Sequence, residues 1–220
     1  MDSQQHQDDF ISLADAMRQV LAGHIPDSRP LNEAIKSKQP IPIWRETRRY
    51  YESCRHLIGG SKEALAIDPY AVNWMALFSP IEYEAWNSIR EYGLPFYPQY
   101  PVSKYFADFA DPHSSLVIEC DGDAWHDKSR DQTRDEAMKA LGWQILRIPG
   151  RQFYAPPIDM WAVVDFELEG DREAAQAMIY RWATSSAHGA ISAIAHSLYG
   201  HVIFGVNDIA LRFAFMDRLI

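Results

Sequence analysis

The sequence of 220 residues contains few cysteines, since only Cys54 and Cys120 occur. They form no Cys-x-x-Cys pair, and their spacing is not that of zinc ligands, so we expect neither a disulfide framework nor a zinc site. Strand parity puts Cys120 on the face opposite Glu119, which predicts a small buried apolar side chain rather than a nucleophile.

Long apolar runs are also missing. No run of 18 or more apolar residues occurs, and the polar start Met1–His6 lacks the basic and then apolar pattern of a secretion signal. We therefore expect a soluble, cytoplasmic protein without a membrane partner. With 47% hydrophobic residues, the chain can bury a substantial core.

Basic residues are outnumbered, with 21 Lys and Arg against 30 Asp and Glu and a formal net charge of -9. Phosphate binding depends on Lys and Arg that release counterions from the nucleic acid. The balance argues against a protein that coats nucleic acid through its bulk charge. Any surface for nucleic acid must be local.

Acidic residues lie inside two otherwise apolar segments, 105–110 and 115–122, which a turn at 111–114 separates. A turn centred in this tetrapeptide puts Asp108 directly opposite Glu119 on two antiparallel strands. Opposed Cβ atoms are only about 4.5–5.5 Å apart, where like charges repel unless a positive charge lies between them. A divalent cation with oxygen ligands satisfies this arrangement. The alternative is a hairpin whose carboxylates face water while its other face is buried; we favour the metal site.

Several short blocks resemble, in order and spacing, a PD-(D/E)XK nuclease family, the domain-of-unknown-function family related to very-short-patch-repair endonucleases. The resemblance covers Ser79 to Phe153. The blocks are Ser79-Pro80-Ile81-Glu82, Gln99, Ala107-Asp108-Phe109, Ile118-Glu119-Cys120-Asp121-Gly122, Trp125-His126, Asp131 with Arg134, and Leu141-Gly142-Trp143-Gln144-Ile145-Leu146-Arg147. Two positions depart from the family pattern. Ala107 replaces a proline, and Asp121 stands where a Glu-x-Lys motif has its lysine.

The resemblance implies an α/β (α+β) fold with a restriction-endonuclease-like core, in which helices flank a mixed β-sheet. We expect a helical N-terminal extension over 1–78, the core over 79–168 and a mainly helical C-terminal region over 169–220. The implied function is metal-dependent phosphodiester hydrolysis by a DNA endonuclease or nickase. The alternatives are a non-catalytic nucleic-acid-binding or interaction module on a degenerate nuclease core, and an RNA-cleaving toxin.

Local patterns predict the elements of this core in the order β-β-β-α-β after a first helix. A Ser-Pro-x-Glu start is typical of a helix that begins after Ser79. The other expected elements are strands over 96–102, 105–110, 115–122 and 144–148 and a helix over 129–141. Outside the core we expect helices over 10–21, 44–58, 174–182 and 190–198, an irregular proline-marked connection over 26–42, and a strand over 202–206.

The chemistry assigns roles to the carboxylates. Asp108 and Glu119 would hold Mg²⁺ directly, with Mn²⁺ as a substitute, and Asp121 or Glu82 would complete the shell or bind a second ion. Capping alone would also account for Glu82. In the absence of a lysine at position 121, water would be oriented by a side chain nearby. The candidates are Gln99, His126 and Lys128, each of which also has a purely structural explanation.

Local basic residues are the candidate contacts for nucleic acid. Arg45, Arg48 and Arg55 share a helix face on which interspersed glutamates favour a solvated, ion-paired surface instead. On the helix after His126, a phosphate contact through Lys128, Arg130 or Arg134 competes with a plain ion pair to Asp131. The apolar sets of the C-terminal region indicate packing or the surface of a homodimer.

Overall fold

The computed structural model describes residues 26–58, 67–122, 128–204 and 209–219. The expected helix over 10–21 and His126 lie outside these ranges. In chain order the elements are α2 (Arg29–Ser37), α3 (Pro40–Ser53), η1 (Trp74–Ala76), α4 (Pro80–Glu91), β1 (Tyr97–Val102), β2 (Tyr105–Asp111), β3 (Leu116–Asp121), α5 (Lys128–Lys139), β4 (Gln144–Pro149), η2 (Gly150–Tyr154), α6 (Met160–Leu168), α7 (Arg172–Ser185), α8 (Ala187–Tyr199) and α9 (Ile209–Arg218).

The sheet has four strands in the order β1-β2-β3-β4, antiparallel except for the parallel pair β3–β4. The mixed sheet and the β-β-β-α-β order are therefore confirmed. The prolines of β1 lie on an edge strand, where a missing N–H is tolerated. In β2 and β3, Phe109, Ala110 and Asp111 pair with Ile118, Val117 and Leu116. These three pairs have the register predicted from the turn. Past them, the Asp108 side chain accepts a hydrogen bond from the Cys120 N–H of β3.

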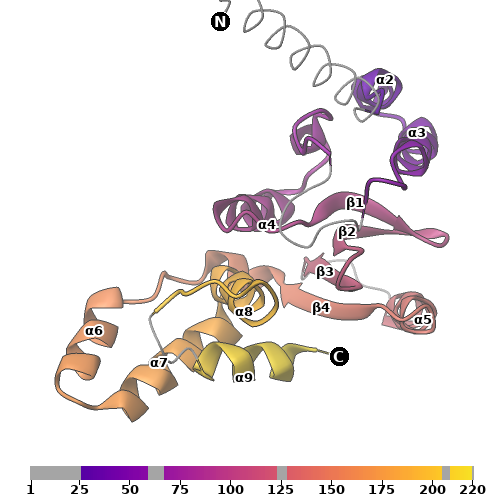
Figure 1. The fold of residues 1–220 in the computed structure, drawn as a ribbon. Helices are drawn as coiled ribbons and strands as arrows, with labels where there is room; N and C mark the ends of the chain where they lie inside the picture. Colours follow the sequence, from indigo (N-terminus) through magenta and orange to yellow (C-terminus); the bar gives the residue numbers. More distant parts are fainter. Residues whose placement is uncertain (1–25, 59–66, 123–127, 205–208, 220) are drawn as a thin grey trace, which may run out of the picture.

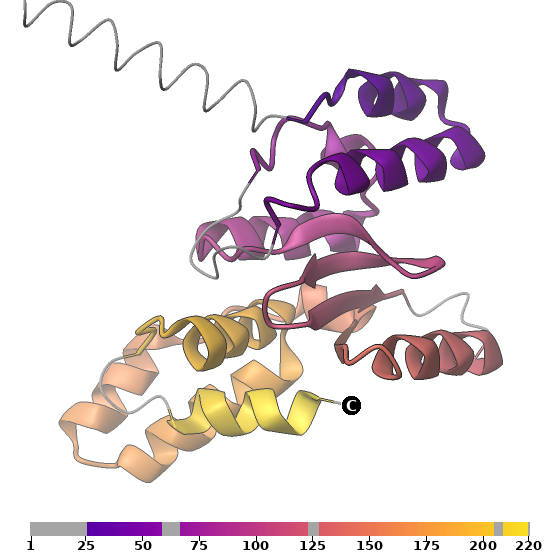
Figure 2. The same cartoon turned by 45° about the vertical axis from the view of Figure 1, so that its right-hand side comes forward.

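Both faces of the sheet are covered (Figures 1 and 2). One large core joins α4 and the sheet to α6–α9, with Phe109, Ile118 and Ile148 fully buried in it. On the other face, Met138 of α5 packs against Val117 and Ile145. The hairpin is therefore not a half-exposed ribbon, and its acidic residues lie beside buried apolar side chains.

Two prolines begin helices at the N-terminal end. The structure forms α2 and α3 where an irregular connection was expected, so that prediction is wrong over 29–42. Pro30 and Pro40 each occupy the first turn, where the missing N–H would have no helical partner and the fixed φ suits a helix. The expected helix over 44–58 starts earlier and ends at Ser53. A cluster that contains Leu31, Tyr51 and Trp74 packs this part of the chain against Tyr97 of β1.

The C-terminal helices confirm the packing role of their apolar residues, since α7, α8 and α9 share the core with the sheet. Close contact explains Gly189, because a Cβ there would come within 2.7 Å of the Trp182 carbonyl oxygen. The expected strand over 202–206 is wrong for its described residues 202–204, which form no strand. No helix in the described ranges is both long and apolar enough to span a membrane.

Candidate active site

The capping box at the start of α4 is confirmed, and it does more than begin a helix. The backbone N–H of Ser79 donates to Glu82 Oε2 at 2.6 Å, and the N–H of Glu82 donates to Ser79 Oγ. The other oxygen, Glu82 Oε1, accepts from Gln99 Nε2 at 2.8 Å. Glu82 therefore links α4 to β1 and brings the Gln99 amide beside a carboxylate.

Gln99 has an unusual backbone. Its φ is 48°, in the left-handed region that non-glycine residues seldom adopt, although it lies inside a strand. The pairs Pro98–Phe109 and Tyr100–Ala107 flank it, so Gln99 is level with Asp108 on the neighbouring strand. Such strain persists only where the surroundings enforce it, and it is concentrated at functional sites. Here it accompanies an amide aimed at Glu82.

Asp108 is held between the two strands of the hairpin. Its Oδ2 accepts a hydrogen bond of 2.8 Å from the Cys120 N–H, close to the last of the paired residues. Burial, and then the charge of Glu82, raise the pKa of Asp108 to about 7, while the Cys120 N–H and Arg134 oppose this rise. The site thus disfavours a lone negative charge on Asp108.

Glu119 points toward α5 and is only 3% exposed. Arg134 Nη2 lies 2.5 Å from Glu119 Oε1 and also donates to the Phe106 carbonyl at 2.8 Å. Burial raises the pKa of Glu119 well above its usual range, the charge of Asp108 adds to this, and Arg134 and Arg147 act against it. Arg134 therefore serves as the counter-charge of a predicted metal ligand.

Asp121 has a partner that the sequence analysis did not assign. Arg147 Nη1 lies 2.7 Å from Asp121 Oδ1, and Arg147 Nη2 lies 2.5 Å from Asp135 Oδ1 on α5. The parallel register places Arg147 opposite Glu119 on the neighbouring strand β3. Glu119 was singled out because it is a charged residue inside an apolar strand, and Arg147 is likewise a charged residue inside the apolar strand 144–148. It could have been found by the same reasoning.

Of the remaining predicted residues, Arg45 and Arg48 have partners other than the carboxylates of this network. Arg45 is exposed and pairs with Glu46, which confirms an ion-paired surface at that position. Arg48 donates to the Ser103 carbonyl and lies over the Phe106 ring at 4.9 Å from its centroid. Lys128 and Arg130 fall in the first turn of α5, where the structure describes the backbone alone.

The cluster as a whole is rich in oxygen donors. Arg134 and Arg147 pair with the carboxylates of Glu119, Asp121 and Asp135, and Arg134 also acts on the charge of Asp108. Glu82 adds a fifth carboxylate, which acts on the charge of Asp108 and binds Gln99. This excess of partly buried negative charge and an all-oxygen donor set fit a hard divalent cation. Among the described residues, however, no three His, Cys, Asp or Glu side chains converge on one point for a metal ion. Glu119 and Asp121 form ion pairs with arginines instead. Glu82 accepts hydrogen bonds from Ser79 and Gln99.

Comparison with known proteins bears on this region of the chain. Residues 82–166 match the model of the restriction-endonuclease-like family REase_MTES_1575. The match spans the network from Glu82 to Arg147 and supports a nuclease superfamily; a relation to very-short-patch-repair endonucleases stays a prediction.

Among solved structures, the chain is similar to the catalytic domain of the homing endonuclease I-Bth0305I, at 18% identity and a TM-score of 0.29. That similarity covers 49% of this chain and 98% of the other. No curated protein matches the sequence.

The two functions of Glu82 can be separated by substitution. We expect Glu82→Gln to keep the stability of the protein, because a glutamine can still accept from the Ser79 N–H. We expect it to slow cleavage about 10²-fold, because it removes one charge from the cluster. Thermal unfolding and single-turnover cleavage measure the two effects. If Glu82→Gln cleaves normally and only Glu82→Ala loses stability, Glu82 is a helix cap and nothing more.

Proposed function

We propose that this protein is a metal-dependent nuclease that hydrolyses phosphodiester bonds, specifically a DNA endonuclease or nickase. One observation carries the proposal: Glu82, Asp108, Glu119 and Asp121 gather beside a strained Gln99, within a segment that matches a restriction-endonuclease-like family. Carboxylates with a purely structural role would be costly beside Asp108, because Glu82 and Asp121 repel the charge of this half-buried aspartate.

Asp108 and Glu119 are the residues that would hold Mg²⁺ or Mn²⁺, with Asp121 or Glu82 as further ligands. A bound ion would polarise the phosphoryl oxygens and lower the pKa of a bound water. Glu119 and Asp121 would exchange an arginine for the ion, since each now contacts a guanidinium group. Arg134 and Arg147 would then each lose one carboxylate partner, while Arg147 keeps Asp135 and Arg134 keeps the Phe106 carbonyl. Their released N–H groups could stabilise the charge that develops on the phosphate in the transition state.

Water orientation falls to another side chain, because Asp121 occupies the lysine position of the family pattern. Gln99 has structural support, since its amide already donates to Glu82 from a fixed, strained backbone. His126 and Lys128 stay predictions, because the first lies outside the described residues and only the backbone of the second is described.

Alanine at each of these three positions tests the assignment. We expect one of the variants to lose about 10²–10³ in single-turnover rate without weaker substrate binding, as for removal of one positioned donor. A rate loss confined to one position identifies the residue. Wild-type rates in all three variants would contradict this set.

The proposed activity is tested by incubating the protein with supercoiled plasmid, linear duplex, single-stranded DNA and RNA. Each substrate is combined with Mg²⁺, Mn²⁺ or a chelator. We expect nicked or linear plasmid with either metal and none with the chelator. Cleavage of RNA alone would favour a ribonuclease. If no combination is cleaved, the departure at Asp121 favours the second candidate, a non-catalytic binding module on a nuclease core.

The remaining partner and location assignments are proposals of the same kind. Nucleic acid is the proposed partner, and the cytoplasm is the proposed location. A homodimer through the C-terminal helices stays a prediction.

A further inference from the structure

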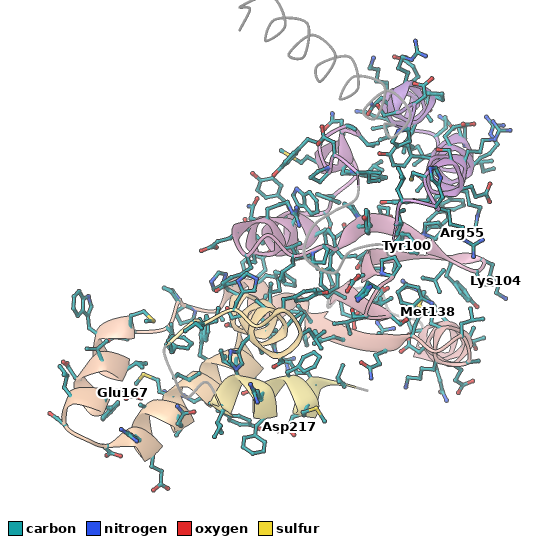
Figure 3. The ribbon with its side chains drawn as sticks, viewed as in Figure 1. Arg55, Tyr100, Lys104, Met138, Glu167 and Asp217 are labelled. Atoms are coloured by element: carbon teal, nitrogen blue, oxygen red, sulfur yellow. The ribbon has the colours of Figure 1, made fainter. Side chains whose placement is uncertain are left out.

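A groove lies between the end of α3, the β1–β2 hairpin and the segment before β4. It has a volume of about 490 Å³ and is lined by Arg48, Arg55, Tyr100, Val102, Leu141 and Trp143, among others. We call it the hairpin groove. Figure 3 labels Arg55 and Tyr100 on this side of the molecule, with Lys104 at the tip of the hairpin.

The arginines of α3 and the turn after it fall into two groups. Arg45 and Arg49 both pair with Glu46, which offsets part of their charge. Arg48 instead contacts a carbonyl and the Phe106 ring, and within the described part of the chain neither Arg48 nor Arg55 forms an ion pair. In a chain with a net charge of -9, this is a local positive site.

Aromatic rings form the second component of the hairpin groove. The rings of Tyr100 and Trp143 are 6.0 Å apart, and both are half-buried, so part of each ring faces the groove. Tyr51, which is buried, packs edge-on against Tyr100 with the two ring centroids 5.0 Å apart. Partly exposed aromatic rings beside arginines are the combination on which unpaired bases stack while their phosphates are neutralised.

Two chains of contacts link the hairpin groove to the carboxylate cluster. Tyr100 directly follows Gln99, which donates to Glu82. Arg48 lies over Phe106, whose carbonyl accepts from Arg134, the partner of Glu119. The groove therefore adjoins the proposed site of cleavage along β1 and β2.

We propose that the hairpin groove binds an unpaired segment of a nucleic acid, with Arg48 and Arg55 on its phosphates and with bases stacked on Tyr100 and Trp143. The inference rests on the proposed nuclease function and narrows its substrate to nucleic acid with a single-stranded part. In a duplex the bases are stacked on one another, and their faces cannot reach the two rings. Glu52 also lines the groove, and its charge opposes binding of a phosphate close to it.

The test is fluorescence anisotropy with the full chain in a chelator, so that binding is measured without cleavage. The labelled probes are single-stranded DNA, single-stranded RNA, a blunt duplex and a duplex with a single-stranded tail. We expect the wild type to bind the tailed duplex and at least one single strand more tightly than the blunt duplex. The two single strands distinguish DNA from RNA as the source of the unpaired segment.

Two variants test the two components of the hairpin groove. Trp143→Leu should weaken binding of the preferred single strand at least about fivefold, the low end for loss of one stack. Arg55→Ala should make the plot of log binding constant against log salt shallower by about 0.7, the value for one phosphate contact on a single strand. Arg55 is exposed, so its substitution keeps the test valid even if Trp143→Leu fails to fold. Arg49→Ala is the matched control and should change neither quantity.

The proposal is overturned if Arg55→Ala behaves like Arg49→Ala, if the blunt duplex binds as tightly as the tailed one, or if no probe binds. Cleavage assays keep this result separate from the proposed function. Wild-type binding by the groove variants of an active nuclease would reject the groove alone. Groove-dependent binding without cleavage under any metal would reject the nuclease.

Discussion

Asp108→Asn and Glu119→Gln should each abolish cleavage while the fold survives. Both substitutions keep the shape of the side chain and remove its charge. In Asp108→Asn, the amide oxygen can still accept the hydrogen bond that the Cys120 N–H now donates to the carboxylate. A bound metal ion supplies several kcal/mol of charge stabilisation to the transition state. Loss of a direct ligand should therefore reduce the single-turnover rate by about 10⁴-fold or more.

The measurement is cleavage of labelled DNA in Mg²⁺ or Mn²⁺, with circular dichroism and thermal unfolding to verify the fold. Glu136→Gln is the matched control. It removes a carboxylate from an exposed position on α5 outside the cluster, so the rate should stay at the wild-type value. Calorimetry provides an independent readout. Unchanged Mg²⁺ and Mn²⁺ affinity in both Asp108→Asn and Glu119→Gln would contradict the assignment of these residues as ligands.

Arg134→Met should lower the free energy of unfolding by about 3–5 kcal/mol. The substitution leaves Glu119, which is only 3% exposed, without its partner at 2.5 Å, and it removes the donor to the Phe106 carbonyl. Breaking a buried ion pair on one side is costly because the remaining charge stays in a medium of low polarity. The side chain of Arg134 is 21% exposed, so water can offset little of this cost.

Urea unfolding measures the effect, and a second substitution identifies its cause. In Arg134→Met with Glu119→Gln, the orphaned charge is gone, so the double variant should be more stable than Arg134→Met alone. Lys36→Met breaks an ion pair in which both side chains are 71% exposed, and it should cost less than about 1 kcal/mol. A loss below about 1 kcal/mol in Arg134→Met, the range of an exposed pair, would show that Glu119 does not depend on this arginine.

Short-range rules predicted the elements that carry the candidate site. The turn between β2 and β3 is fixed by four residues, and its centre determines which residues are opposed. The pairing of Phe109, Ala110 and Asp111 with Ile118, Val117 and Leu116 therefore followed from counting. The start of α4 is equally local, because the two partners of a capping box are three residues apart. Local rules failed at α2 and the start of α3, where proline begins a helix as readily as it ends one.

The sequence by itself determined the acidic hairpin and its nuclease-like spacing, whereas only the tertiary structure decided where each charge points. Arg147 and Asp121 are 26 residues apart in the sequence, and the parallel pairing of β3 with β4 brings them together. Arg134 meets Glu119 because α5 packs on the sheet face that carries Val117. The hairpin groove likewise joins side chains from three distant segments. Periodicity reports which face of its own element a residue occupies, but not what the fold places opposite that face.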